Sequence, residues 1–175
     1  MRKLKNKELK RINSSEFKKI KKTPIILILD NVRSAMNVGS IFRTADAFIV
    51  EKIYLCGITA TPPNKEILKT ALGAQETVDW QYHKDTSALV KTLKHSNNYI
   101  VAVEQTENAT ALNNFHRPKN KIILIFGNEV FGVNQQVIDL CDECIEIPQF
   151  GTKHSLNISV SAGMVIWELW NQMGE

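Results

Sequence analysis

The sequence predicts an α/β protein in which a mainly parallel sheet carries helices on both faces. Short apolar segments rich in β-branched residues recur along the chain, which is typical of strands that are covered on both sides. Segments with helical periodicity lie between them, and strands that alternate with helices need crossover connections that leave the strands parallel. The chain has 175 residues and 43% hydrophobic content, which is enough for one domain with a sizeable core.

Five segments are expected to form the strands of this sheet. They are residues 25–30, 52–57, 99–103, 121–126 and 144–147. The first four are apolar and mostly β-branched, and the fifth stops at Pro148, which has no N–H to donate to a neighbouring strand. Helical periodicity places helices at residues 38–48, 65–72, 87–94, 135–141 and 157–172. The last of these is apolar on almost all sides, as in helices that are deeply buried or lie at a subunit interface.

A basic arm, residues 1–23, precedes the expected domain, residues 24–175. The arm contains ten Lys or Arg against two Glu, a net charge of +8; because the whole chain carries +4, the domain carries −4. Basic arms bind polyanions because each neutralised phosphate releases counterions, although a solubilising tail has the same composition. Apolar residues at helical spacing, interrupted at Asn13 and Ser14, predict two short helices that dock on the domain.

Composition excludes several classes of protein. The longest uninterrupted apolar runs are five residues long, whereas a membrane span needs roughly 20, and residues 1–10 lack the apolar stretch of a secretory signal. Three cysteines cannot all pair with one another, which favours a reducing, cytoplasmic setting. Cys141 and Cys144 have no second pair for zinc, and the histidines lack metal-ligand spacing, so no metal site is expected.

Polar residues that favour ligand binding follow the first strand. Arg43 comes four residues after Gly39 in the next helix, and helical side chains lean toward the N-terminus, so we expect Arg43 to lie over Gly39. A glycine there leaves bare backbone and space beside the guanidinium, which suits a ligand that approaches closely. Asn37 is expected to be the N-cap of this helix. An ordinary cap beside a solvated arginine is the alternative interpretation.

Two further loops have the composition of binding sites. Gly127 and Gly132 flank Asn128 and Glu129 directly after a buried strand, which suits close contact of the backbone with a ligand, although a plain turn also explains it. This loop lacks the Lys and Ser/Thr of a phosphate-binding loop, and no dinucleotide-binding fingerprint follows any strand. The loop at residues 147–157 ends in polar side chains that can cap the last helix or hold a substrate. Because ligands of parallel sheets bind beyond the carboxyl ends of the strands, these loops are expected to meet at one edge.

The three loops together resemble those of the SpoU-type (TrmH-like) RNA 2′-O-ribose methyltransferases of the SPOUT superfamily. The family's N-x-G-x-x-x-R motif is matched by Asn37, Gly39 and Arg43. Its G-x-E-x-x-G motif is matched by Gly127, Glu129 and Gly132. Its I-P…S-L-N-x-S motif is matched by Ile147, Pro148, Ser155, Leu156, Asn157 and Ser159. The resemblance covers roughly residues 25–169, and Gln149 departs from the methionine that many relatives have after the proline.

The resemblance implies a C-terminal trefoil knot, an obligate homodimer and S-adenosyl-L-methionine bound in the knot. The cofactor-binding positions that follow from it are Val103, Gly127, Asn128, Gly132, Ile147 and Leu156. It implies transfer of a methyl group from this cofactor to a ribose 2′-hydroxyl of RNA. A catalytic domain preceded only by a basic arm favours tRNA over rRNA as the substrate. A non-catalytic RNA-binding protein with the same fold is the alternative.

The catalytic residues that the resemblance implies are Arg43, Asn37, Glu129, Ser155 and Asn157. A binding module has no need of this whole set, which favours the enzyme. Guanidinium groups stay protonated in proteins, so Arg43 is expected to hold the adjacent phosphate and stabilise the developing oxyanion rather than to act as a base. Asn37 is expected to fix the ribose or Arg43, and Glu129 to orient Arg43 or the substrate. Ser155 and Asn157 are expected to position the ribose.

Overall fold

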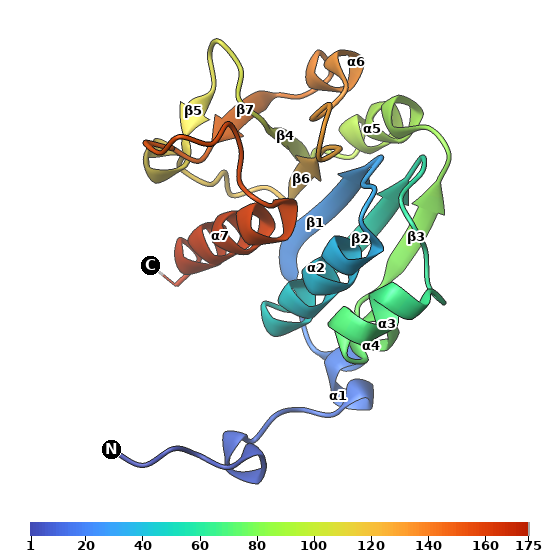
Figure 1. The fold of residues 1–175 in the computed structure, drawn as a ribbon, viewed down its shortest axis with the longest axis vertical. Helices are drawn as coiled ribbons and strands as arrows, with labels where there is room; N and C mark the ends of the chain where they lie inside the picture. Colours follow the sequence, from blue (N-terminus) through green and yellow to red (C-terminus); the bar gives the residue numbers. More distant parts are fainter. Residues whose placement is uncertain (175) are drawn as a thin grey trace.

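A sheet of seven parallel strands forms the centre of the structure, a computed structural model that describes residues 1–174 (Figure 1). The strands are β1 (Thr23–Asp30), β2 (Val50–Cys56), β3 (Trp80–His83), β4 (Tyr99–Val103), β5 (Thr110–Ala111), β6 (Ile122–Phe126) and β7 (Glu143–Glu146). They lie in the order β3-β2-β1-β6-β4-β7-β5, and each neighbouring pair runs parallel. The predicted fold class is confirmed, and the expected trefoil knot stays a prediction.

Helices connect the strands and cover both faces of the sheet. They are α2 (Ala35–Ala47), α3 (Lys65–Ala71), α4 (Ala74–Thr77), α5 (Thr86–Lys94), α6 (Gln135–Ile138) and α7 (Ile158–Asn171), and a short 3-10 helix, η2, spans Leu112–Asn114. Successive residues of β1 point to opposite faces, so Leu27 lies in a core with α2, α3 and α7, whereas Ile28 lies in a second core with α5 and α6. No helix within residues 1–174 combines the length and the apolar composition needed to cross a membrane.

Three short elements, β3, α4 and β5, go beyond the expectation from sequence. β3 lies at the edge of the sheet with Gln81 and Tyr82 exposed, so it lacks the apolar run of a buried strand. α4 has four residues and β5 has two, which is too short for a period to be visible. The helix expected at 38–48 begins three residues earlier, at Ala35, and the helix expected at 135–141 ends three residues earlier, at Ile138. The other boundaries agree within two residues.

The basic arm contains two short helices, as its spacing predicts: a 3-10 helix, η1 (Asn6–Leu9), and α1 (Ser14–Lys19). Asn13 lies between them and caps α1 through its side chain. Phe17 of α1 is buried in the main core, and the Lys22 ammonium lies 3.5 Å from the centre of its ring. The second helix of the arm is therefore docked on the domain.

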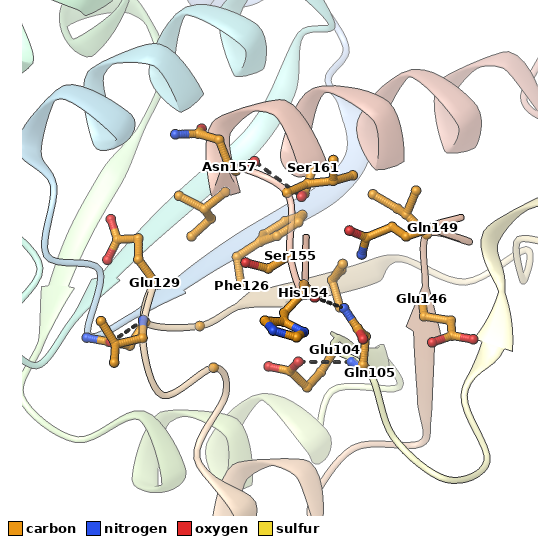
Figure 2. Close-up of a pocket in the computed structure, with 18 residues that line it drawn as sticks. Glu104, Gln105, Phe126, Glu129, Glu146, Gln149, His154, Ser155, Asn157 and Ser161 are labelled. Carbon is orange, nitrogen blue, oxygen red and sulfur yellow. Dashed lines mark hydrogen bonds between the residues drawn. The ribbon is translucent and has the colours of Figure 1, made fainter. Parts of the chain in front are cut away.

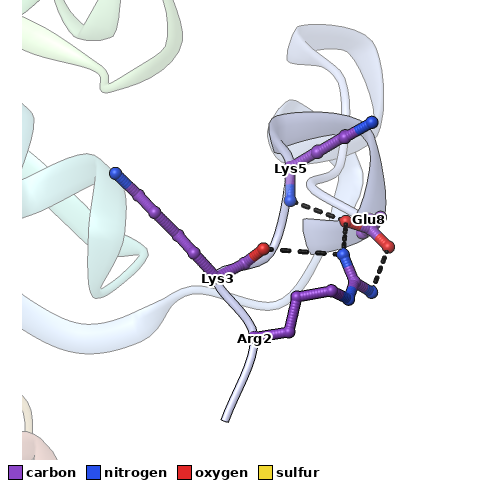
Figure 3. Close-up of polar contacts among 4 residues, drawn as sticks. All are labelled: Arg2, Lys3, Lys5 and Glu8. Carbon is purple, nitrogen blue, oxygen red and sulfur yellow. Dashed lines mark hydrogen bonds and ion pairs between the residues drawn. The ribbon is translucent and has the colours of Figure 1, made fainter.

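The first helix of the arm stands away from the domain (Figure 1). Glu8 accepts a hydrogen bond from Lys5 N at 2.6 Å and forms an ion pair with Arg2 at 2.7 Å (Figure 3). Exposed ion pairs of this kind add little stability because water screens them. The expected docking is thus observed for α1 alone, and η1 leaves its lysine, Lys7, in solvent.

Candidate active site

A cavity of about 550 Å3 lies at the carboxyl ends of β4, β6 and β7 (Figure 2). The six positions expected to bind the cofactor all line it: Val103, Gly127, Asn128, Gly132, Ile147 and Leu156. Of the residues expected to be catalytic, Glu129, Ser155 and Asn157 also line it. Arg43 and Asn37 do not. The loops that follow these strands therefore meet at one edge of the sheet, as the order of the motifs predicts.

The cavity is acidic. Its ionisable lining residues are Glu104, Glu129, Glu146 and His154, and no Lys or Arg within residues 1–174 lines it. Fixed negative charges in a partly enclosed site lower the energy of a cationic ligand and raise that of a phosphate group. The cavity therefore favours a positively charged ligand over one that carries a phosphate group.

The turn between β6 and α6 is closed by its own backbone. Asn128 N donates to Gly132 O at 3.0 Å, and Gly132 N donates to Asn128 O at 2.9 Å. A Cβ atom on Gly127 would lie 2.2 Å from both the carbonyl carbon of Gly132 and the nitrogen of Val133, so a side chain does not fit there. The contact that demands glycine at position 127 is with the turn itself rather than with a ligand.

Gly132 is favoured by its backbone conformation, and it lies against a side chain from the neighbouring loop. Its φ is +67°, which favours glycine, and a Cβ atom would lie 2.2 Å from Glu104 Oε2. The same oxygen accepts a hydrogen bond from Val133 N at 2.9 Å, and Oε1 accepts one from Gln105 N at 2.9 Å. Glu104 therefore holds the turn after β6 against the end of β4. Sequence reasoning missed Glu104, although a carboxylate directly after a buried strand was the available signal.

A second link fastens the loop that leads into α7. Gln105 Nε2 donates to His154 O at 2.9 Å, which ties this loop to the end of β4 (Figure 2). Neither residue belongs to the three motifs. The remaining lining residues that sequence reasoning missed are Phe126, Val130, Glu146, Gln149, Ile158 and Ser161. Their positions follow from how the loops cross in space, which no spacing along the chain reveals.

Glu129 lies at the N-terminus of α2. Its carboxylate accepts hydrogen bonds from Arg33 N at 2.8 Å, Ser34 N at 3.0 Å and Asn37 Nδ2 at 3.0 Å. Burial by itself raises the pKa of Glu129, but the hydrogen bonds from Arg33, Asn37 and Ser34 outweigh it, and the pKa lies below its ordinary value. Glu129 is therefore ionised near neutral pH and fixes the loop after β1 as an acceptor, not as a proton donor.

Asn37 joins two of the other motif residues. The expectation that it caps α2 is wrong, because Ser34, one turn earlier, already supplies a side-chain oxygen that accepts from Asn37 N at 3.3 Å. The Asn37 side chain instead donates to Glu129 Oε1 and accepts from Asn157 Nδ2 at 3.2 Å. Asn157 is in turn the N-cap of α7 and accepts from Ser159 N at 2.9 Å. Glu129, Asn37 and Asn157 thus link three loops by hydrogen bonds.

Most of this chain is similar to known proteins. Residues 24–167 match the model of the SpoU rRNA Methylase family. The chain belongs to this family. A 23S rRNA (guanosine-2'-O-)-methyltransferase RlmB of Neisseria meningitidis serogroup B is 33% identical to it over 150 residues, which cover 85% of this chain and 59% of the relative. An uncharacterized tRNA/rRNA methyltransferase of Borreliella burgdorferi is 32% identical over 160 residues, 90% of this chain and 68% of the relative.

Solved SpoU structures share the fold. The A. aeolicus TrmH/SpoU tRNA modifying enzyme superposes with a TM-score of 0.81 at 25% identity, covering 92% of this chain and 80% of that one. An AdoMet-bound rRNA methyltransferase from Sinorhizobium meliloti has a TM-score of 0.81 at 23% identity, covering 90% of this chain and 60% of that one. This SpoU chain thus spans 59% of the length of its Neisseria relative and 60% of the Sinorhizobium chain.

The glycine of the first SpoU motif has a different role from the one expected. A Cβ atom on Gly39 would lie 2.1 Å from Thr70 Oγ1 and 2.5 Å from Ile67 O, so this buried glycine lets α3 pack directly on α2. The expectation of open space beside Arg43 at this position is wrong, because α3 occupies that space. Backbone-to-backbone packing of two helices is a tertiary contact, and a helical period alone does not reveal it.

Arg43, the last residue of that SpoU motif, is exposed and lies outside the acidic cavity. It lines a second hollow of about 510 Å3 beside α2 and α3. Within residues 1–174, the hydrogen bonds of Glu129 go to the loop after β1 and to Asn37 rather than to Arg43. Within this chain, the arginine and the expected cofactor positions therefore line different hollows.

Proposed function

We propose that this protein transfers a methyl group from S-adenosyl-L-methionine to a ribose 2′-hydroxyl of RNA. The observation that carries the proposal is the acidic cavity, because the six positions that the SpoU resemblance assigns to the cofactor line it together. The Neisseria relative is named for guanosine 2'-O-methylation of 23S rRNA, and the Sinorhizobium structure contains AdoMet, which supports the same activity here.

The residues of the cavity fit this cofactor. S-adenosyl-L-methionine carries a sulfonium and an ammonium against one carboxylate, so a wall that contains Glu104, Glu129 and Glu146 favours it. The volume of about 550 Å3 lies within the ~300–1,000 Å3 of small-molecule sites. Val103 and Ile147, at the ends of the neighbouring strands β4 and β7, line the cavity and would contact it. When bound, the cofactor supplies an electrophilic methyl group.

Arg43 acts on the side of the nucleophile. A ribose hydroxyl must lose its proton as it attacks, and a guanidinium stays protonated, so Arg43 stabilises the developing alkoxide and holds the adjacent phosphate. That phosphate is the group proposed to take the proton. Ser155 and Asn157 position the ribose from the wall of the cavity for in-line attack. Asn37 and Glu129 are positioning residues that fix Asn157 and the loop after β1.

We propose that the substrate is tRNA, with rRNA as the alternative. The A. aeolicus protein, described as a tRNA modifying enzyme, supports tRNA. Transfer of tritiated methyl from the cofactor to purified tRNA and to rRNA tests both the reaction and the substrate. Mapping of ribose methylation in RNA from cells with and without the gene then locates the nucleotide. Methyl on rRNA alone would establish the alternative substrate, and no transfer to either RNA would favour a binding protein.

We propose that the protein is a homodimer in which Arg43 of one protomer faces the cavity of its partner. α7 carries an exposed apolar patch, in which Trp167 and Trp170 stack with ring centres 5.6 Å apart and remain 52% and 41% exposed. Phe48 of the α2 end packs against both tryptophans. Large exposed aromatic patches are typical of subunit interfaces. Both hollows border this patch, because Phe48 lines the one that contains Arg43 and Ser161 of α7 lines the acidic cavity.

Trp167→Glu is expected to break this dimer, because the new carboxylate would be buried without a partner in the interface. Sedimentation velocity at micromolar concentration should give a dimer for the unchanged protein and a monomer for the variant. Lys91→Glu, an exposed change on α5 at the opposite face of the sheet, is the control and should stay dimeric. A monomeric unchanged protein would contradict the proposal.

The arm is proposed to supply much of the affinity for RNA. Deletion of residues 1–12 removes six Lys or Arg but keeps α1 and its buried Phe17. We expect weaker RNA binding and a flatter dependence on salt, since each lost phosphate contact lowers the slope by roughly 0.7–0.9. Fluorescence anisotropy with labelled tRNA between low and physiological salt measures both. An unchanged salt slope in the shortened protein would assign the arm to solubility alone.

A further inference from the structure

The second hollow brings two cations together. Arg43 of α2 and Lys69 of α3 both line it, and its lining contains no Asp or Glu. Neither cation forms an ion pair with any of residues 1–174. Two unpaired cations in one concave site, without a carboxylate among them, create a positive potential that favours an anion. The hollow is thus opposite in charge to the acidic cavity.

The approach of α3 to α2 fixes where Lys69 stands. Because Gly39 has no side chain, α3 comes close enough for Thr70 Oγ1 to donate to Met36 O at 2.9 Å. Thr70 is the next residue after Lys69, so this contact between the two helices holds the lysine at the hollow that Arg43 lines. The site is therefore built by packing rather than by chance proximity of long side chains.

The hydroxyl groups around the hollow are already used as donors. Ser40 Oγ donates to Met36 O at 2.9 Å, and Thr44 Oγ1 donates to Ser40 O at 3.2 Å. Their protons point into the backbone of α2, so recognition of an anion falls to the two cations. A phosphate diester has the single negative charge and the exposed oxygens that a guanidinium and an ammonium bind together.

We propose that Lys69, together with Arg43, binds a backbone phosphate of the substrate RNA next to the ribose that is methylated. The inference rests on the proposed function and adds a residue that lies outside the three motifs. Lys69 anchors the RNA, so it sets the affinity for RNA, whereas Arg43 also acts on the reacting oxygen. The two hollows thereby separate the ligands by charge, with the cationic cofactor in one and the RNA phosphate in the other.

Lys69→Met tests this assignment, because methionine keeps the length and helix propensity of the side chain and removes its charge. Lys65→Met is the matched control: Lys65 is also exposed and lies one turn earlier on α3, but it does not line the hollow. Lys69→Met should raise the KM for RNA about fivefold and lower the salt slope of RNA binding by about one, as for one lost phosphate contact. The Kd for S-adenosyl-L-methionine should stay within about twofold, because Lys69 does not line the acidic cavity.

A double variant asks whether the two cations share one phosphate. If they do, Arg43→Ala with Lys69→Met weakens RNA binding by less than the product of the two single effects, because residues that hold the same group are not additive. RNA binding by anisotropy is measured independently of methylation. Failure of the unchanged protein to methylate RNA would therefore refute the proposed function without deciding the phosphate contact. Equal RNA affinity and salt slope in Lys69→Met and Lys65→Met would overturn the inference.

Discussion

Replacement of Arg43 by alanine is expected to abolish methyl transfer and to leave the affinity for S-adenosyl-L-methionine unchanged. Loss of one group that stabilises developing negative charge lowers kcat by roughly 100- to 1,000-fold. The cofactor should not sense the change, since Arg43 does not line the acidic cavity. Arg43→Lys should also fail, because one ammonium does not reproduce the planar fork of the guanidinium.

Isothermal titration with the cofactor and a single-turnover methylation assay measure the two properties separately. Ser40→Ala is a suitable control, because Ser40 lines the same hollow but its hydroxyl already donates a hydrogen bond to Met36 O. Parallel loss of cofactor affinity and transfer in Arg43→Ala would place the arginine in the cofactor site and remove it from the reaction.

Gly127→Ala is expected to destroy cofactor binding and to destabilise the fold. The new methyl group would lie 2.2 Å from backbone atoms of Gly132 and Val133, neither of which can rotate away. The turn must open, at a cost of about 1–3 kcal/mol of unfolding free energy, as in other overpacked sites. Because this turn forms one wall of the cavity, the Kd for the cofactor should rise at least tenfold.

Gly151→Ala is the matched control, since a Cβ on this exposed glycine meets nothing within 4 Å and Gly151 does not line the cavity. Alanine there should be neutral or slightly stabilising, because it reduces the conformational entropy of the unfolded chain. Urea denaturation and calorimetry compare the two variants. Full cofactor affinity in a folded Gly127→Ala protein would contradict the proposed site.

Mixing the two inactive variants, Arg43→Ala and Gly127→Ala, tests whether Arg43 acts across the proposed dimer. If Arg43 of one protomer serves the cavity of its partner, a heterodimer of Arg43→Ala and Gly127→Ala contains one intact pair of hollows. Mixed and re-equilibrated subunits should then regain about a quarter of the original activity, since half of the dimers are mixed and each has one working site. No recovery, with heterodimers demonstrated, would mean that Arg43 acts within its own subunit.

The strands at the centre of the sheet could be predicted because burial on both faces requires apolar residues along each strand, and this pattern is visible in the sequence. Both faces of β1 and β6 are covered, so each strand contains an unbroken run of five apolar residues, 25–29 and 122–126. β3 lacks this apolar pattern, because it is an edge strand that leaves Gln81 and Tyr82 in solvent. The path that the chain takes between the elements could not be predicted from side-chain periodicity either, because periodicity describes single elements only.

The candidate site could likewise be predicted only in part. The motif residues of the turn after β6 could be located by their types and spacing, and the structure places them on one cavity. The reason for Gly39 could not be foreseen, because it lies against the backbone of α3, which only the folded chain brings near. The reason for Gly127 is the plain turn that its sequence also allowed. The role of Glu104 could not be predicted either, because its hydrogen bond to Val133 N joins residues that are 29 positions apart in the sequence.

The loops at the acidic edge are tied to one another by the chain's own carboxylates and amides, from Glu104, Glu129 and Gln105. A change in any one of them is therefore transmitted to its neighbours, which leaves this part of the protein little freedom to diverge. On the proposed function, adaptation to a new RNA would come instead from the basic arm, where substitutions break none of these hydrogen bonds. The edge that is proposed to hold the cofactor could in this way be retained while the RNA that it acts on changes.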